Sequence, residues 1–462
     1  MKTRYLIIIF LSCLTLSCKD DFDDVIDPSE TADIQNFVWR AMHELYLYKE
    51  DSPDLANDRF ASSEEFSDFL KSNNSPEELF DHLLASQDRF SIIVDDYTAL
   101  ENRLDGLTKT TGIRISFIQE STSNQVFGFI RYVLPGSSAA EKGLKRGMIF
   151  DQINGETLTA ASNFQELTSG ENYSIRIAEF SDDELISTDE TLSLQKRMLQ
   201  ENPIYYSDVL DFNTAQIGYL VYNNFRGEYD AELNAVFQNF QTDNIDELII
   251  DLRYNTGGDV ESCKDLASMI TGQYNNQIFA KQKFNANFDP VDLLFDTKIR
   301  NGEQINSLGL SQVYILTSRQ SASASELLIN SLNAYIDVIQ VGETTVGKFE
   351  ASRTLYDAPN YSRRNANIGH TYALQPLISK LENANGHGDY VNGLVPQHMI
   401  TENFKEAKAF GDPSETLLLK TLNIMGVSNE ENGKDYNSEE SFEILFEDYQ
   451  NQPSYQRMYS PQ

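Results

Sequence analysis

The pattern of apolar and polar positions changes twice along this chain. Between Ile34 and Leu84 the large apolar residues recur mostly three or four positions apart, which is typical of amphipathic helices. From Gly106 to Leu194 short apolar runs alternate at period two and are separated by turn residues, which predicts β-strands. We therefore expect a helical domain over residues 31–100 and a β-rich domain over residues 105–195.

From Ile217 onward, apolar strands alternate with segments of helical periodicity. Leu248–Leu252 is a nearly continuous apolar run, as expected for a strand that is covered on both faces. Val313–Leu316 and Val338–Gly342 follow, with a helical segment between them, and this alternation is typical of a mostly parallel sheet. The expected fold class is α/β, with residues 200–427 as the core domain.

The chain is strongly acidic. Its 462 residues carry a formal net charge of −35, so they offer no basic surface for a nucleic-acid backbone or for an anionic membrane. The final residues, 428–462, are acidic as well. We expect a loosely held tail in which only Phe442–Phe446 could dock on the rest of the protein.

The N-terminus has the features of a bacterial export signal. Two basic residues precede the apolar run Tyr5–Leu11, which is too short to cross a bilayer. Leu14–Cys18 resembles a lipobox, in which the cysteine becomes the lipidated first residue of the mature protein. We expect a signal peptide over residues 1–17, a lipid on Cys18 and an acidic tether over residues 18–30. Plain secretion is the alternative.

This leader implies an exported lipoprotein whose only contact with the bacterial outer membrane is its lipid, on the periplasmic or the cell-surface side. With Cys18 lipidated, Cys263 is the one remaining thiol of the mature chain, so no disulfide can form within it. A lone cysteine of this kind is expected to be a small buried apolar residue. His387 lacks a second ligand at metal-binding spacing, so we expect neither a metal nor a cofactor.

A serine cluster follows the apolar strand Val313–Leu316 and opens a predicted helix. Within Ser321–Glu326, Ser323 and Glu326 fit a capping box, which needs no further function. The same serine could instead be a nucleophile, because a neutral lysine can activate a serine without a histidine. Lys348 lies 25 residues after Ser323. A helix leading away for about 18 Å and a strand returning by a similar distance can bring this lysine back to the helix start.

A lysine that acts as a base must be uncharged. Lowering its pKa from about 10.4 to about 7–8 disfavours the charged form by about 3.5–4.5 kcal/mol. Burial in an apolar pocket can supply this free energy, whereas a neighbouring carboxylate would oppose it. If Lys348 is such a base, we expect the carboxylate of Glu350 to point away from it.

A glycine pair stands at the carboxyl end of the predicted central strand, where open α/β sheets bind their ligands. The backbone N–H groups of Gly257 and Gly258 could approach a substrate carbonyl there, as an oxyanion hole requires. Ala324 could supply a second N–H at the start of the serine helix, where the helix dipole favours negative charge. The structural alternative is a tight turn from strand to helix.

Three motifs in this order and spacing resemble the C-terminal processing (tail-specific) serine proteases. These motifs are Asp251–Gly258, Ser321–Glu326 and Gly342–Lys348. The resemblance covers roughly residues 85–425 and implies a protease core of the crotonase-like, Clp-protease-like kind. It also implies that the β-rich unit is a PDZ domain, through Leu134–Ala140 and Gly143–Gly147.

The resemblance also assigns roles to individual residues. Ser323 would be the nucleophile and Lys348 the general base. The N–H groups of Ala324 and of either Gly257 or Gly258 would form the oxyanion hole, and the residues alone do not decide between the two glycines.

Two further assignments follow from the same resemblance. Ser352 stands four residues after the lysine, where the family often has a glutamine that orients the base. In the PDZ domain, Gly112 and Ile113 would form the loop that captures a terminal carboxylate, and a substrate strand would add beside Ile113 and Ile115. A PDZ domain that only gates or braces the protease is the alternative.

The sequence thus predicts a serine endopeptidase that cleaves unfolded or C-terminally exposed polypeptides through an acyl-enzyme on Ser323. One alternative is a catalytically inactive, PDZ-containing adaptor that binds peptides, since Ser352 departs from the usual family pattern. A second alternative is a Ser/His hydrolase that uses His370 or His387. Polypeptides are the expected partners, and the oligomeric state is left open.

Overall fold

The computed structural model describes residues 33–182, 184–212, 215–428, 442–448, 450, 455 and 457–459. The predicted leader, with Cys18, lies outside these residues. Within the described ranges, every helix is too short or too polar to span a lipid bilayer.

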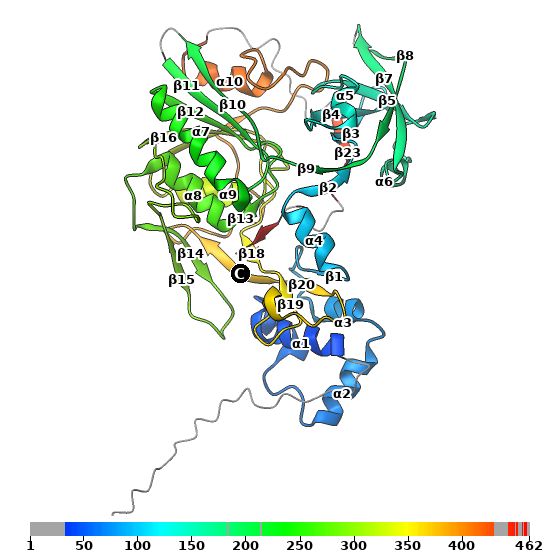
Figure 1. Cartoon of the computed structure of the whole chain (residues 1–462), viewed down its shortest axis with the longest axis vertical. Coiled ribbons are helices and arrows are strands. Elements are labelled where there is room, and N and C mark those ends of the chain that lie inside the picture. Colours follow the sequence, from blue (N-terminus) through cyan, green and yellow to red (C-terminus); the bar gives the residue numbers. More distant parts are fainter. Residues whose placement is uncertain are drawn as a thin grey trace, which may run out of the picture.

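A six-stranded sheet forms the centre of the core domain (Figure 1). In spatial order its strands are β10 (Ile204–Phe212), β11 (Ala215–Tyr222), β12 (Glu247–Asp251), β16 (Gln312–Thr317), β17 (Asp337–Gly342) and β22 (His398–Met399). β10 runs antiparallel to β11, and all other neighbours are parallel. The α/β class and the mostly parallel sheet predicted from the sequence are therefore confirmed. Asp251 pairs with Leu316, so the glycine and serine motifs leave the same edge of this sheet.

Helices cover both faces of this sheet (Figure 1). One face carries α7 (Asp230–Thr242), α8 (Val260–Thr271) and α9 (Ala324–Leu332), and the other carries α10 (Thr416–Ile424). In strand β12, Leu248 and Ile250 belong to the first apolar cluster and Ile249 belongs to the second. A strand that is buried on both sides must be apolar at every position, which explains the continuous run in the sequence.

A second six-stranded sheet packs against α9 and includes the end of the chain. In spatial order its strands are β13 (Gly258–Asp259), β24 (Met458–Tyr459), β18 (Glu350–Ser352), β21 (Leu377–Glu382), β14 (Ile278–Lys283) and β15 (Val291–Leu294). The terminal strand β24 lies between β13 and β18 and is parallel to both. The glycine motif and the segment after Lys348 therefore flank the C-terminal residues.

The β-rich domain forms a sheet of its own. Its elements are β3 (Ile113–Glu120), β4 (Val126–Val133), α5 (Ser138–Glu141), β5 (Ile149–Ile153), β6 (Glu156–Thr157), α6 (Phe164–Leu167), β7 (Asn172–Ser181) and β8 (Glu184–Gln195). A pair of strands, β2 (Leu107–Thr110) and β9 (Arg197–Gln200), joins this domain to its neighbours. Strand β23 (Phe442–Glu447) extends the sheet at the edge of β3. Residues 442–447 are thus a paired strand, which agrees with Phe442–Phe446 being the part of the tail that could dock.

The N-terminal domain is helical, as the spacing of apolar residues indicates. Its elements are α1 (Asp33–Leu45), α2 (Ser63–Ser72), α3 (Pro76–Leu83), β1 (Ile92–Val94) and α4 (Tyr97–Leu104). The hydroxyls of Ser62 and Ser75 cap α2 and α3 by accepting hydrogen bonds from backbone N–H groups. β1 pairs with β20 (Ala373–Gln375), which pairs with β19 (Leu355–Tyr356). This pairing fixes the helical domain to the core domain.

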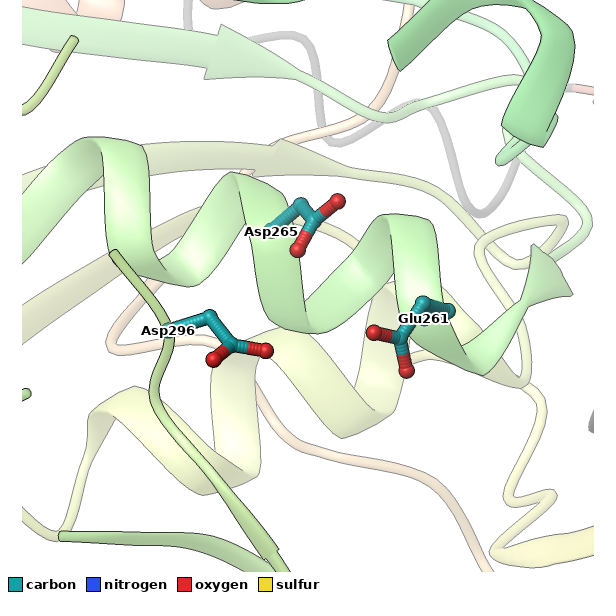
Figure 2. Close-up of side chains that lie close together, drawn as sticks. All are labelled: Glu261, Asp265 and Asp296. Carbon is teal, nitrogen blue, oxygen red and sulfur yellow. The ribbon is translucent and has the colours of Figure 1, made fainter. Parts of the chain in front are cut away.

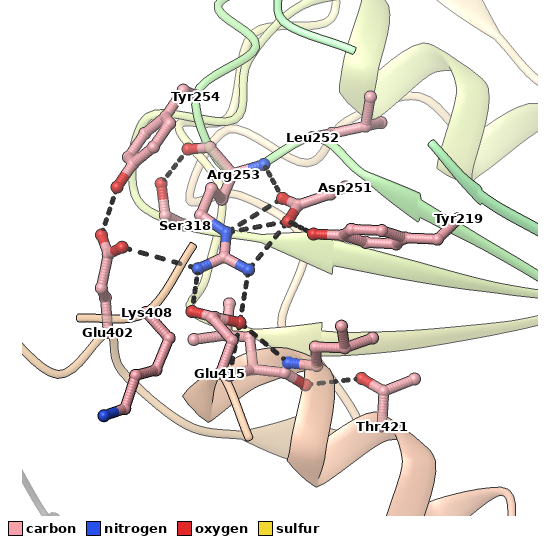
Figure 3. A network of polar contacts seen from close by, with 12 residues as sticks. Tyr219, Asp251, Leu252, Arg253, Tyr254, Ser318, Glu402, Lys408, Glu415 and Thr421 are labelled. Carbon is pink, nitrogen blue, oxygen red and sulfur yellow. Dashed lines mark hydrogen bonds and ion pairs between the residues drawn. The ribbon is translucent and has the colours of Figure 1, made fainter. Parts of the chain in front are cut away.

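A buried arginine holds the loop that carries the glycine motif (Figure 3). Arg253 follows β12, and its guanidinium donates to Asp251 (Nε, 3.0 Å) and to Glu415 (Nη1, 2.6 Å). Tyr219 donates to the same aspartate at 2.8 Å. Glu415 in turn caps α10 by accepting from two backbone N–H groups. The end of the central strand is thereby tied to the helix on the opposite face.

The β-rich domain is attached to this network. Arg146, which lies in the Gly143–Gly147 motif, donates to the hydroxyl of Tyr254 at 2.8 Å and also binds Glu402. Tyr254 itself donates to Glu402. Because Tyr254 lies in the loop between β12 and the glycine pair, a side chain of the β-rich domain contacts the segment that shapes the candidate site.

Candidate active site

Ser323 is the N-cap residue of α9, where the chain arrives from β16. Its backbone has φ 66° and ψ −115°, and a positive φ is rare and strained for a residue that has a Cβ. The residue is fully buried, and its hydroxyl makes no hydrogen bond within the described part of the chain. Its N–H donates to Glu326, as in the capping box expected from the sequence. A cap residue ordinarily has an extended backbone, so the capping box does not explain the strained φ of Ser323.

The carboxylate of Glu326 ties the serine to the lysine loop. Its Oε2 accepts hydrogen bonds from the N–H of Ser323 at 2.7 Å and from the N–H of Lys348 at 2.9 Å. Its Oε1 accepts from the N–H of Gly347 at 2.6 Å and from the hydroxyl of Thr345 at 2.5 Å. Burial raises the pKa of Glu326 to about 7, although these hydrogen bonds oppose the rise. One buried carboxylate thus fixes both halves of the predicted dyad.

The amine of Lys348 is fully buried. It lies 4.8 Å from the centre of the Phe90 ring, which belongs to the helical domain. Burial lowers the pKa of this amine well below its ordinary value, and the nearby guanidinium of Arg457 lowers it further. The environment therefore favours the neutral amine that a general base requires.

Three carboxylates act in the opposite direction on this amine. Glu350, Asp88 and Glu326 each raise the pKa of Lys348, but they do not cancel the effect of burial. Glu350 is buried, and its Oε1 accepts a hydrogen bond from the hydroxyl of Tyr48 at 2.7 Å. We expect Glu350 to point away from a lysine that acts as the base, yet its charge still raises the pKa of the amine, by less than burial lowers it.

The backbones of Ser323 and Lys348 are close together, but their side chains are not hydrogen-bonded to each other. Ser323 Oγ makes no hydrogen bond within the described residues, so it is not bonded to Lys348 in this structure. The backbones of the two residues are nevertheless held together, because both N–H groups donate to the same oxygen of Glu326. The path predicted from the 25-residue spacing, out along a helix and back along a strand, does bring them together.

The two glycines of the motif differ in what their N–H groups bind. Gly257 donates to the side chain of Asn255 at 2.9 Å, whereas Gly258 donates to the carbonyl oxygen of Arg457 at 2.6 Å. Their φ angles of 116° and 134° favour glycine. A Cβ on Gly257 would lie 2.5 Å from the Cβ of Ser323, so a larger residue could not be accommodated. The N–H of Gly258 is therefore the one that reaches a peptide carbonyl beside the serine.

Ala324 and Ser352 are the other two predicted residues of the site. Ala324 is the first residue of α9, so its N–H belongs to the helix terminus that favours negative charge. The hydroxyl of Ser352, in β18, donates to the carbonyl of Met458 at 3.1 Å. That bond connects Ser352 to the C-terminal strand β24. The role of Ser352 in orienting the base stays a prediction.

The predicted peptide-binding residues of the β-rich domain lie at its edge strand. Gly112 has a φ of 94°, and Ile113 and Ile115 of β3 are buried. β23 runs antiparallel to β3, and the N–H of Asp448 donates to the carbonyl of Ile115 at 3.2 Å. This edge thus accepts an extended segment as an added strand. In this structure the added strand is the chain's own tail.

Sequence reasoning missed the contribution of the helical domain to the site. Arg89 Nη2 donates to the carbonyl of Gly347, the residue before the lysine, at 2.9 Å. Asp88 accepts a hydrogen bond from the hydroxyl of Tyr46 at 2.7 Å, and Phe90 forms the wall beside the amine. Asp88–Phe90 has no local signature, because its role depends on a contact across 258 residues of sequence.

The histidines of the Ser/His alternative bind elsewhere. His370 faces Asp357 at 3.2 Å and accepts from the N–H of Tyr372 at 3.1 Å. The backbone N–H of His387 donates to Asn383 at 3.0 Å. Since the hydroxyl of Ser323 makes no hydrogen bond within the described residues, neither histidine is bonded to it.

Three carboxylates gather on and beside α8 (Figure 2). They are Glu261, Asp265 and Asp296. The amine of Lys264 is 2.7 Å from both Glu261 and Asp296, so a cation of the chain already balances these two. Burial, reinforced by the charge of Asp230, raises the pKa of Asp265 to about 8. The cluster is therefore a lysine-bridged structural feature, and we assign no metal to it.

Comparison with known families and sequences gives consistent results. Residues 216–369 match the model of peptidase family S41, and residues 33–92 match the peptidase S41 N-terminal domain. The chain is 22% identical over 291 residues to carboxyl-terminal-processing peptidase 1 of Arabidopsis thaliana chloroplasts, a match that covers 60% of this chain and 55% of that protein. It is 23% identical over 314 residues to the carboxyl-terminal-processing protease of a Picosynechococcus species, covering 67% and 68%. The matched part spans little more than half of the plant protein.

A solved structure is similar over most of both chains. The crystal structure of a protein described as an S41 protease from Bacteroides fragilis superposes with a TM-score of 0.68 at 26% sequence identity. The similarity covers 85% of this chain and 98% of that one. The arrangement of the helical, β-rich and core parts is therefore shared with that structure and is not peculiar to this chain.

Proposed function

Because the chain belongs to peptidase family S41, we propose that it is a serine endopeptidase with a Ser323/Lys348 dyad. The observation that carries this proposal is the state of the lysine amine, which is fully buried and has a lowered pKa, on a loop bound to the same carboxylate oxygen as Ser323. A neutral amine beside a serine at a helix N-terminus is the minimum that nucleophilic catalysis without histidine requires.

The reaction would proceed through an acyl-enzyme. The Lys348 amine takes the proton of the Ser323 hydroxyl as its oxygen attacks the substrate carbonyl carbon. The N–H groups of Gly258 and Ala324 bind the oxygen that becomes negative in the tetrahedral intermediate. The protonated amine then gives its proton to the leaving nitrogen, and a water molecule activated by the same amine hydrolyses the ester.

The substrates we propose are unfolded or C-terminally exposed polypeptides. The β-rich domain would be a PDZ domain that binds a substrate strand along Ile113 and Ile115, and the core would be of the crotonase-like, Clp-protease-like kind. The PDZ assignment is supported by the strand that already pairs with β3. The assignment of the core is supported by its mostly parallel sheet with helices on both faces. We also propose that the protein is exported and anchored by a lipid on Cys18 to the bacterial outer membrane.

Cleavage of an unfolded protein tests this proposal against its alternatives. Casein should be cleaved by the wild-type chain and not by the Ser323→Ala variant. Equal, negligible cleavage by both would favour the peptide-binding adaptor. Full activity in the Lys348→Met variant would reject the dyad and favour a histidine base, and a His370→Ala variant then serves as the matched test.

A further inference from the structure

The chain's own C-terminal residues lie at both places where a polypeptide substrate would bind. β23 extends the edge of β3 in the β-rich domain, and β24 lies between β13 and β18 in the core (Figure 1). Residues 442–447 thus lie at the predicted peptide-binding edge, and residues 457–459 lie beside the predicted catalytic serine. The contacts at each end resemble those of a bound ligand.

Apolar contacts hold the first end. The ring of Phe446 lies 6.2 Å from that of Phe117 and 6.1 Å from that of Phe164, measured between ring centres. Phe117 and Phe164 belong to the apolar core of the β-rich domain, and Leu445 packs against the same cluster. Strand β23 therefore adds both backbone hydrogen bonds and buried apolar side chains, as a peptide does when it extends a sheet.

Charged groups join the next residues of the tail to the serine loop. Asp448 forms an ion pair with Arg131, which is fully buried in the β-rich domain. Arg131 also donates to the side chain of Gln320 at 2.6 Å, and Gln320 donates to Glu447 of the tail. Gln320 lies three residues before Ser323, so the tail, the β-rich domain and the serine loop meet at one buried polar junction.

The second end lies in the core at the catalytic residues. The Met458 side chain is fully buried in the apolar cluster of α8 and α9, and its carbonyl accepts from Ser352 at 3.1 Å. The carbonyl of Arg457 accepts from the N–H of Gly258 at 2.6 Å. A Cβ on Gly257 would lie 2.4 Å from this oxygen and 2.5 Å from the Cβ of Ser323, so those two atoms are within about 5 Å, the sum of these distances.

We propose that residues 442–448 and 457–459 act as an intramolecular ligand of the substrate-binding track and compete with other polypeptides for it. The Arg457 carbonyl takes the place of the substrate carbonyl at the oxyanion hole, and Met458 fills the apolar pocket that follows. This inference rests on the proposed function, because it names the ligand of the same site. It also predicts that the pocket beyond the reacting bond prefers an unbranched apolar side chain.

Competition of this kind can be strong even when each contact is weak. A tethered ligand acts at an effective concentration of about 1 mM, so an affinity of only about 100 μM would keep roughly nine tenths of the sites occupied. Release of the tail should then raise the rate on a dilute substrate by about tenfold. This increase in rate requires no change in the conformation of the helical domain or of the core domain.

Two full-chain variants should release the tail while Ser323 and Lys348 themselves are kept. Met458→Asp places a charge in the apolar pocket, and Asp448→Arg reverses the ion pair with Arg131. Both should cleave dilute casein about tenfold faster than the wild-type chain, the value expected for loss of the tethered ligand. Met198→Asp makes the same chemical change at a methionine whose side chain is 55% exposed, and it should leave the rate unchanged.

A binding measurement separates failure of this proposal from failure of the proposed function. A labelled peptide with the sequence of residues 442–462 is titrated, by fluorescence anisotropy, into Ser323→Ala and into Ser323→Ala/Met458→Asp. The peptide should bind the double variant about tenfold more tightly, because only there is the track empty. Such binding without any casein cleavage would reject the proposed endopeptidase and still support the tail as ligand. Casein cleavage with equal rates and equal binding in all variants would overturn the tail proposal and leave the endopeptidase standing.

Discussion

Two buried basic side chains lie on the loops that frame the candidate site, and their pKa values shift in opposite directions. Arg253 is 1% exposed and Lys348 is 0% exposed, so solvent does not distinguish them. Burial alone would lower the pKa of both. For Arg253, the charges of Asp251 and Glu415 outweigh burial and raise the pKa well above its ordinary value. For Lys348, burial prevails and the pKa falls well below its ordinary value.

The difference lies in the geometry of the partners. The planar guanidinium of Arg253 donates to both oxygens of Glu415, at 2.6 Å and 2.9 Å, and to Asp251 as well. The lysine amine faces the ring of Phe90, and the Arg457 guanidinium adds a second positive charge nearby. A buried basic group that is paired with matched carboxylates stays charged and stabilises the fold. A basic group whose pKa is lowered by burial loses its charge and can then accept a proton.

The largest expected effect is the loss of activity in Lys348→Met. General base catalysis typically contributes 10²–10⁴-fold, so casein cleavage should fall by about that factor. The free energy of unfolding should stay the same or rise, because a buried polar amine is replaced by an apolar side chain of similar size. Cleavage rates and thermal unfolding of the same preparation measure both quantities. A large loss of stability would mean that the amine is a structural ion-pair partner like Arg253.

Arg253→Met should show the reverse pattern. The variant leaves Asp251 and Glu415 buried without their guanidinium, and breaking a buried ion pair costs about 3–5 kcal/mol. We expect the free energy of unfolding to fall by that amount in urea titrations, with a smaller loss of activity per folded molecule. Lys420 lies in α10, the helix that Glu415 caps, and Lys420→Met is the matched control for removal of a positive charge. Unchanged stability in Arg253→Met would contradict the structural role of the network.

Buried carboxylates extend the comparison to the acidic side chains. Arg253 holds the pKa of Glu415 down at about 2 against the effect of burial, whereas burial raises the pKa of Asp265 to about 8. The contribution of Glu415 to stability is present above about pH 4.5 and is lost as the pH falls toward 2. The contribution of Asp265 is present below about pH 4 and is lost as the pH rises through 8.

Asp265→Asn should therefore change stability in a pH-dependent way. The amide cannot ionise, so the variant should gain more than about 1 kcal/mol over the wild type at pH 8.5 and much less at pH 5. Urea titrations at the two pH values measure this difference. A gain that is equal at both would show that Asp265 is already charged across this range and would contradict its raised pKa.

The smallest expected effect concerns the tail. Met458→Asp should move Arg457 away from the lysine and so remove the second cause of the lowered pKa. The pKa of Lys348 should then rise slightly and stay below its ordinary value, because burial is the larger cause. A lysine pKa that returns fully to its ordinary value in this variant would assign the whole shift to Arg457 and contradict the importance of burial.

Much of this arrangement could be predicted from local patterns. The apolar runs of β12 and β16 fixed the parallel sheet, and the 25 residues between Ser323 and Lys348 fitted a return to the same edge. The roles of Phe90 and Arg457 could not be predicted, because each depends on contacts between segments distant in sequence. The apolar residues Phe442–Phe446 marked the part of the tail that could dock, and Phe446 does so. Met458 was expected to lie in the loose part, whereas the core domain supplies an apolar pocket for it.

Direct titration of the lysine amine tests the central claim, which is that Lys348 is neutral where the enzyme works. In protein labelled with ¹³C at lysine Cε, the resonance that disappears in Lys348→Met is followed by NMR from pH 5 to pH 11. We predict a titration well below the ordinary lysine pKa of about 10.4. A resonance that titrates at or above that value would show a permanently charged amine and would contradict its role as the base.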